Sequence, residues 1–209
     1  MRGDQSGFGA ECQRELNNVA ATGSLTRPRF DALTLRPFNH PPTLTASEIF
    51  SGLTPAEAHE LFESLHATNK PAYKGCMQVT ASRRRLRSVF LERKPRAERH
   101  AWMQSVLARP ENEDLSLEVL QNWLLGSHRP LLGDFLEACG FTHEDGLIDD
   151  IPAQPAREVV DAAVDAVAAK HPALAVKIYL NLFQPAAPGA WPDLDALLVI
   201  DPRLALVRK

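Results

Sequence analysis

The spacing of apolar side chains from Leu53 onward limits the possible folds of this chain more than any other feature. Thr54, Pro55 and Glu57 provide an N-cap, a first-turn proline and a capping-box carboxylate, which together mark a helix start. Apolar residues then recur every third or fourth position, as one face of a helix requires: Ala58, Leu61, Phe62 and Leu65. The sequence therefore predicts a helix from this start to about His66.

The same periodicity continues through the rest of the chain. A second predicted helix starts at Asn69 and runs to about Arg93. Further helices are predicted from Pro95 to Ala108, from the cap Ser116 to Gly126, from Pro130 to Gly140, around Val159 to Val167 with an end before Pro172, from Pro172 to Phe183 and from Asp193 to Val199. We therefore expect an all-α fold, a helical bundle or an irregular array of about eight helices.

One segment also fits a strand. Apolar and other residues alternate from Val176 to Leu182, and Leu197 to Ile200 and Leu204 to Val207 would be natural strand partners. The proline start, the length and the alanine-rich beginning favour a helix. A small C-terminal strand pair remains the alternative.

Prolines, glycines and charge divide the chain into four expected regions. Residues 1–45 mix glycine and proline without a period, which predicts a flexible leader. Residues 46–140 form a helical domain that contains a basic helix, and residues 141–156 form an acidic loop. Residues 157–209 form a C-terminal helical segment that we expect to pack on the first domain.

Composition predicts a soluble, cytoplasmic protein. The 209 residues are 44% hydrophobic and 23% charged, as in ordinary globular domains. No apolar run approaches the roughly 20 residues of a membrane span, and the first ten residues lack the features of a secretory signal. No membrane contact is therefore expected. Cys12, Cys76 and Cys139 are too widely spaced for a zinc-type pair, so we expect reduced thiols.

The motifs of several large enzyme classes are absent. The sequence has no phosphate-binding loop of the Walker type, no Gly-x-Ser-x-Gly elbow and no His-Glu-x-x-His pair. His59, Glu63 and His66 share one side of a predicted helix, which is typical of a solvated polar stripe and, less often, of half a metal site. No cofactor is therefore expected.

The acidic loop contains the densest group of oxygen ligands. Clustered carboxylates suit Ca²⁺ or Mg²⁺, although this spacing does not match the helix-loop-helix calcium pattern. Solvation, helix capping or a partner contact is the competing interpretation. The metal hypothesis names His143, Glu144, Asp145, Asp149 and Asp150.

Positive charge is concentrated in residues 83–99, which include eight basic residues and two acidic ones. Between Glu111 and Asp165 the balance reverses, with thirteen acidic and two basic residues. On a helical wheel the basic side chains point in several directions, so the acidic segment of this chain, a protein partner and nucleic acid all remain possible contacts. The basic residues are Arg83, Arg84, Arg85, Arg87, Arg93, Lys94, Arg96 and Arg99.

These features favour a non-catalytic protein-interaction or scaffold protein over an enzyme. Charge segregation indicates a partner, and the enzyme motifs that would indicate a reaction are absent. A nucleic-acid-associated protein that uses residues 83–99 is the first alternative. A metal-assisted enzyme that uses residues 143–150 is the second.

Trp102, Trp123 and Trp191 lie among aliphatic residues and are expected to anchor the core.

Overall fold

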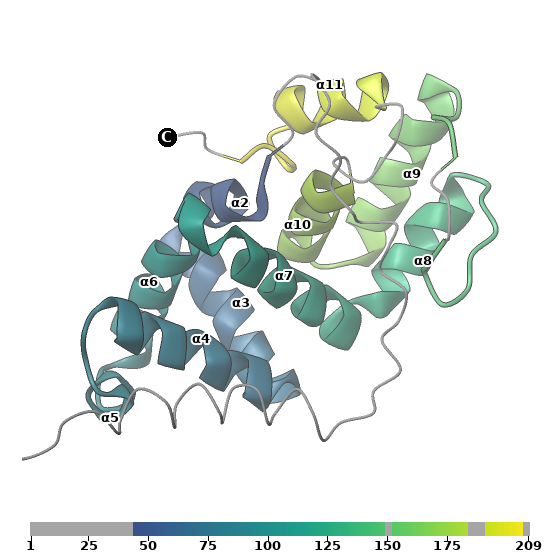
Figure 1. The fold of residues 1–209 in the computed structure, drawn as a ribbon. Helices are drawn as coiled ribbons and strands as arrows, with labels where there is room; N and C mark the ends of the chain where they lie inside the picture. The colour runs from purple at the N-terminus through teal and green to yellow at the C-terminus, as the bar shows by residue number, and fades with distance from the viewer. Residues whose placement is uncertain (1–43, 149–151, 184–190, 207–209) are drawn as a thin grey trace, which may run out of the picture. The chain divides into compact units, whose positions relative to one another are not determined.

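The computed structural model describes residues 44–148, 152–183 and 191–206, and these residues form helices joined by short connections (Figure 1). The prediction of an all-α fold is confirmed, since the described residues contain no strand. The predicted leader lies outside the described residues up to position 43. The helices are α2 (Ala46–Gly52), α3 (Pro55–Thr68), α4 (Lys70–Arg83), α5 (Ser88–Glu92), α6 (Arg96–Leu107), the 3-10 turn η2 (Pro110–Asn112), α7 (Glu113–Ser127), α8 (Arg129–Ala138), α9 (Arg157–Lys170), α10 (Ala173–Phe183) and α11 (Pro192–Ile200).

Helix α3 begins where the sequence predicts. The Thr54 hydroxyl accepts a hydrogen bond from the Glu57 backbone N–H at 3.2 Å, and the Glu57 carboxylate accepts one from the Thr54 N–H at 2.7 Å. This capping box satisfies two backbone donors at the helix start. The apolar face of α3 is then fully buried between α4, α6 and α7.

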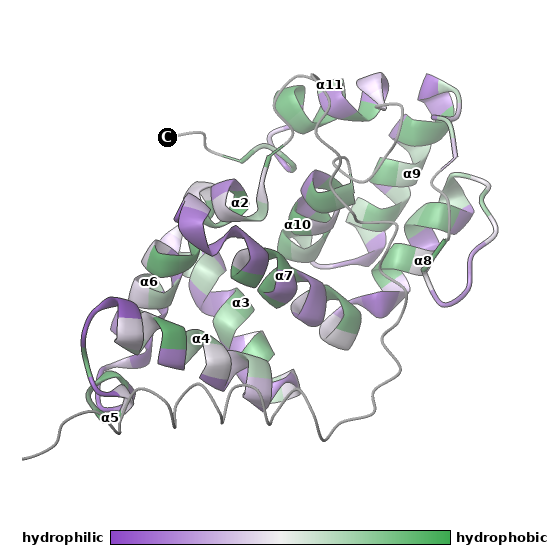
Figure 2. Cartoon of the chain, in the orientation of Figure 1, coloured by the Kyte–Doolittle hydropathy of each residue, from purple (hydrophilic) through white to green (hydrophobic). Residues whose placement is uncertain are grey.

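Helix α10 lies at the centre of the described fold, where it packs against α2, α7, α8 and α9 (Figure 1). Most of its side chains are buried, and much of it has the hydrophobic colour in Figure 2. The strand alternative for residues 176–182 is therefore wrong, and Leu197 to Ile200 belong to α11. A helix that is apolar on nearly all sides alternates over short stretches, which explains the ambiguous pattern.

The predicted helix from Asn69 to Arg93 is interrupted. Helix α4 ends at Arg83, and Arg85 adopts a left-handed conformation with φ of 54°. The Leu86 N–H then bonds to the Ala81 carbonyl at 2.8 Å, and the Arg85 N–H bonds to the Ser82 carbonyl at 3.0 Å. These two bonds form a Schellman motif, which ends a helix. The sequence pattern does not reveal this helix end, because arginine, not glycine, occupies the left-handed position.

The predicted cap at Ser116 is also wrong, because α7 starts earlier, at Glu113. The buried Ser116 hydroxyl lies inside the helix and is hydrogen-bonded to the Leu107 and Asn112 carbonyls at 2.7 and 2.9 Å. A serine that bonds to the preceding turn can stay within a helix.

Among the described residues, no helix is long and apolar enough to span a membrane.

Candidate functional site

Helix α5 and the connection that leads to it from α4 expose three large apolar side chains. The exposed fractions are 38% for Leu86, 51% for Val89 and 57% for Phe90. Helix α5 is anchored to the core by Leu91, which is completely buried. Of the other four residues of this short helix, Ser88 is partly buried and Val89, Phe90 and Glu92 are exposed. We name the exposed residues from Arg84 to Arg93, without Ser88 and Leu91, the α4–α5 surface.

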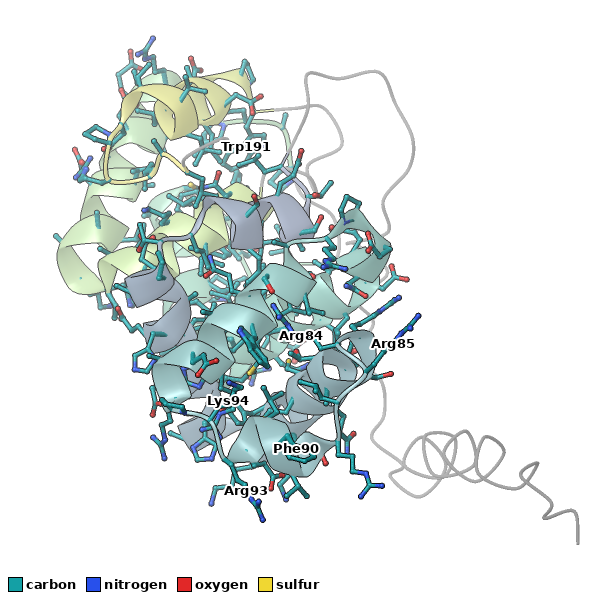
Figure 3. The ribbon with its side chains drawn as sticks, turned by 90° about the vertical axis from the view of Figure 1, so that its left-hand side faces the viewer. Arg84, Arg85, Phe90, Arg93, Lys94 and Trp191 are labelled. Atoms are coloured by element: carbon teal, nitrogen blue, oxygen red, sulfur yellow. The ribbon has the colours of Figure 1, made fainter. Side chains whose placement is uncertain are left out.

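Three arginines of this surface have no side-chain partner among the described residues. The guanidinium groups of Arg85, Arg87 and Arg93 make no hydrogen bond and no ion pair there, and all three residues are exposed. Figure 3 shows Arg85 projecting from this side of the molecule, with Phe90 and Arg93 toward one end of it. The α4–α5 surface therefore combines free positive charge with exposed apolar side chains.

Two further basic residues lie on an aromatic ring. The Arg84 guanidinium carbon is 4.2 Å from the centre of the Trp102 ring, and the Lys94 ammonium is 4.5 Å from it. Arg84 also donates to the Ser105 hydroxyl, and Lys94 pairs with Glu98. Trp102 is half-buried and packs against the edge of the core, so it is not enclosed by the core as Trp123 and Trp191 are. Each cation is therefore held by the ring and by one polar partner.

The remaining basic residues are engaged within the fold. Arg83 donates to the Asn112 side chain at 3.0 Å, Arg96 pairs with Glu63 at 2.5 Å, and Arg99 donates to the Glu92 carbonyl at 3.1 Å. Among the described residues, the ion pairs of residues 83–99 reach Glu63 and Glu98 and none reaches the acidic segment 111–165. Within the described residues, the basic segment therefore reaches the acidic segment through the Arg83–Asn112 hydrogen bond and not through an ion pair.

A second polar group lies between α3 and α6, which bring two imidazoles and a carboxylate together. One ligand atom each of His59, Glu63 and His100 lies within 4.8 Å of the others. The Nδ1 atoms of His59 and His100 are 2.9 Å apart, and the hydroxyl of Tyr73 is 2.9 Å from His100 Nε2. Which nitrogen donates in each bond depends on the tautomer. This is the one such group of potential metal ligands found within the described ranges.

Burial sets the electrostatics of this group. His100 is almost completely buried, and burial together with the neighbouring His59 lowers the pKa of His100 from 6.5 to about 4. At neutral pH His100 is therefore an uncharged ring. The Glu63 carboxylate, whose Oε1 atom is 4.0 Å from His100 Nε2, is held from the other side by Arg96.

The sequence pattern identified two members of this group and missed the third. His59 and Glu63 are one turn apart on α3 and do share a face, but His66 instead packs edge-on against the Tyr73 ring at 4.7 Å. The missing member, His100, comes from α6. No local spacing links positions this far apart, so only the helix packing reveals the group.

The acidic loop has a well-defined turn in its described part. Asp145 and Gly146 both have positive φ, 53° and 79°, and Glu144 and Leu147 exchange two backbone hydrogen bonds of 2.9 Å. This is the pattern of a two-residue hairpin turn, for which Asp-Gly is a preferred sequence. The His143 ring accepts a bond from the Gly146 N–H at 3.0 Å.

Close packing explains the glycine in this turn. A Cβ atom at Gly146 would lie 2.8 Å from the Cβ atom of Leu132 on α8. The dipeptide therefore has a structural role, while Asp149 and Asp150 lie outside the described residues. A divalent cation at this loop stays a prediction.

Comparisons with protein-family models, with curated proteins and with solved structures found no match to this chain. The geometry of its own residues is therefore the basis for a functional hypothesis.

Proposed function

We propose that the protein is a non-catalytic interaction protein that binds an acidic, partly apolar segment of a partner protein through the α4–α5 surface. The observation that carries this proposal is the exposure of Leu86, Val89 and Phe90 beside arginines with no partner in the described fold. Exposed apolar groups of this size, set among charges, are characteristic of interaction sites. Arginine and aromatic residues are also enriched among the residues that contribute most to protein interfaces.

The charge of the surface defines the partner. Arg85, Arg87 and Arg93 offer forked donors that match carboxylates, and Glu92 is the single acidic residue between them. An acidic segment would bring carboxylates to these groups and apolar side chains to Phe90. The free guanidinium groups would also increase the rate of association with a negatively charged partner.

Nucleic acid is the alternative, and two features disfavour it. Single-stranded nucleic acid binds where aromatic rings give successive bases a stacking surface. Phe90 offers one such ring, but the face of Trp102 is already covered by Arg84 and Lys94. Leu86 and Val89 provide no hydrogen bonds to bases or phosphates, whereas both suit an apolar protein segment.

A titration with two probes tests the proposal. The probes are a synthetic peptide that alternates glutamate with leucine and phenylalanine, and a single-stranded oligonucleotide of similar net charge. We expect peptide binding that weakens with salt and that falls about tenfold in Phe90→Ser, a loss of about 1.4 kcal/mol. Oligonucleotide binding that is tighter than peptide binding would favour the alternative.

Matched control variants distinguish specific binding at this surface from nonspecific binding. Ile200 is 66% exposed on α11, so Ile200→Ser removes an apolar side chain of similar exposure at another place. Arg109 is exposed and lies 3.9 Å from Glu111, so Arg109→Ser removes a positive charge outside the surface. We expect Arg93→Ser to weaken peptide binding and both controls to leave it unchanged. Equal losses in controls and surface variants would contradict the proposal.

A further inference from the structure

We infer that His59, Glu63 and His100 form a binding site for one divalent transition-metal ion of the zinc type. Imidazole and carboxylate are ligands that zinc accepts, and three protein ligands leave a coordination position for water. The ligand atoms come from α3 and α6 and already lie within 4.8 Å of one another. This site is separate from the α4–α5 surface and does not depend on the function proposed for that surface.

The distance between the two imidazoles fits a shared cation. The Nδ1 atoms of His59 and His100 face each other at 2.9 Å. Two zinc–nitrogen bonds of about 2.05 Å would span this distance with an angle of about 90° at the metal. If the distance between the two Nδ1 atoms increased by a few tenths of an ångström, the nitrogen–metal–nitrogen angle would come close to tetrahedral. A single proton between the rings and a metal ion are therefore alternative occupants of the same position.

Each end of the group also has the outer contact that metal ligands use. A metal-bound imidazole commonly donates its other N–H to an oxygen, which fixes the tautomer and the ring orientation. The Tyr73 hydroxyl, 2.9 Å from His100 Nε2, stands at that position. Arg96 holds one oxygen of Glu63 at 2.5 Å, which leaves the other oxygen for the cation. The free Glu63 oxygen lies 4.0 Å from His100 Nε2, so the carboxylate must turn toward the two Nδ1 atoms to complete the ligand set.

Exposure provides a path for the ion. His100 is buried, whereas His59 and Glu63 are only partly buried, so the cation would enter along the side of α3 and reach His100 last. Arg96 and Arg99 place positive charge near this path, which lowers the affinity for a cation. The neutralising contribution of Glu63 is therefore essential to binding.

Calorimetry on the full chain tests the site. After treatment with a chelator, the protein is titrated with zinc chloride, and the melting temperature is measured with and without zinc. We expect one ion per chain and a higher melting temperature in zinc. His59→Asn and Glu63→Gln should each weaken zinc binding by tenfold or more. Both residues are partly exposed, so these variants should fold, and their melting temperatures in chelator should match the wild-type value.

Control variants locate the ion. His66→Asn removes a histidine one turn away on α3 that is not in the ligand set, and it should bind zinc as the wild type does. Asp145→Asn tests the acidic loop in the same way. Absence of zinc binding, or binding that both His59→Asn and Glu63→Gln retain, would overturn the inference. Loss of binding in Asp145→Asn alone would assign the ion to the acidic loop.

Cobalt substitution supplies a second, spectroscopic measurement. Co²⁺ bound by imidazole and carboxylate should give visible ligand-field bands without the near-ultraviolet charge-transfer band of a thiolate. Cys76, a buried free thiol on α4, is the alternative ligand that this measurement would detect. A thiolate band would place the ion at a cysteine and would contradict the assigned ligands.

Discussion

The C-terminal ends of α4 and α8 have the same backbone motif but differ in the residue at its left-handed position. At the end of α8, Gly140 has φ of 82°, and the Phe141 N–H bonds to the Leu136 carbonyl at 2.9 Å. At the end of α4, Arg85 has φ of 54°, and Leu86 makes the equivalent bond to Ala81. Glycine adopts this conformation without steric cost, whereas arginine loses roughly 1–2 kcal/mol.

The surroundings of the two ends differ as much as their residues. After α8 the chain turns inward, where Phe141 lies 5.9 Å from the ring of Trp191 and near the aromatic group around Phe135. After α4 it turns outward and exposes Leu86 and Phe90. Backbone strain is often found at functional sites. The strained arginine therefore supports a binding role for the α4–α5 surface, since stability alone would favour glycine.

The largest expected difference between the two regions is in the contribution of their phenylalanines to stability. Phe135 is fully buried against Tyr179, Phe183 and Trp191, so Phe135→Ala should lower the free energy of unfolding by about 3–5 kcal/mol. Phe90 is 57% exposed, and Phe90→Ala should change the free energy of unfolding by no more than about 0.5 kcal/mol. Urea denaturation of both variants measures these changes. A large loss of stability in Phe90→Ala would show that α5 is a core element.

The next largest effect should come from the glycine at the end of α8. Gly140→Ala places a Cβ atom at a position where φ is 82°, and we expect a loss of about 1–2 kcal/mol. No heavy atom lies within 4 Å of that Cβ position, so backbone strain alone causes the effect. A matched control is Gly126→Ala within α7, where the added Cβ also meets no atom and φ is not positive. Helix propensity should make the control slightly stabilising.

The reverse substitution tests the end of α4. Arg85→Gly should raise the free energy of unfolding by about 0.5–1 kcal/mol, because relief of strain exceeds the entropic cost of glycine. It should also weaken binding of the acidic peptide, since a free guanidinium group is lost. Arg85→Ala keeps the strain and removes the same charge, so it should weaken binding without the gain in stability. Equal stability of the two variants would contradict the assignment of strain to Arg85.

The comparison also shows which features a sequence can reveal. The start of α3 and the end of α8 were predictable, because a capping box and a glycine are signals that act over a few residues. The break after α4 was not, since arginine carries no local signal for a left-handed conformation. His59 and Glu63 could be grouped by their spacing on one helix, but His100 joins them only through the packing of α6 on α3. Free and engaged arginines likewise share one sequence pattern and differ only in their three-dimensional neighbours.

The smallest expected effect concerns charge, which is paired on α8 and free on the α4–α5 surface. Asp134 on α8 is hydrogen-bonded to Lys170 at 2.8 Å and to His171 at 2.6 Å, and these contacts lower the pKa of Asp134 below its usual 3.8. A carboxyl group with a lowered pKa in the folded state stabilises the fold above the unfolded-state pKa. That contribution is lost as the pH falls through the folded-state pKa, because the folded protein must then accept the proton.

Asp134→Asn should therefore lower the free energy of unfolding by roughly 0.5 kcal/mol at pH 7, as expected for a largely solvent-screened ion pair. The difference from the wild type should shrink as the pH falls below about 4, the ordinary pKa of aspartate, because the unfolded wild-type chain then takes up the proton before the folded one does. Arg93→Gln removes a free charge and should change stability at neither pH. Urea denaturation at pH 7 and at pH 3.5 measures all three proteins. A pH-independent loss in Asp134→Asn would mean that Asp134 acts through packing, and the contrast between paired and free charge would then fail.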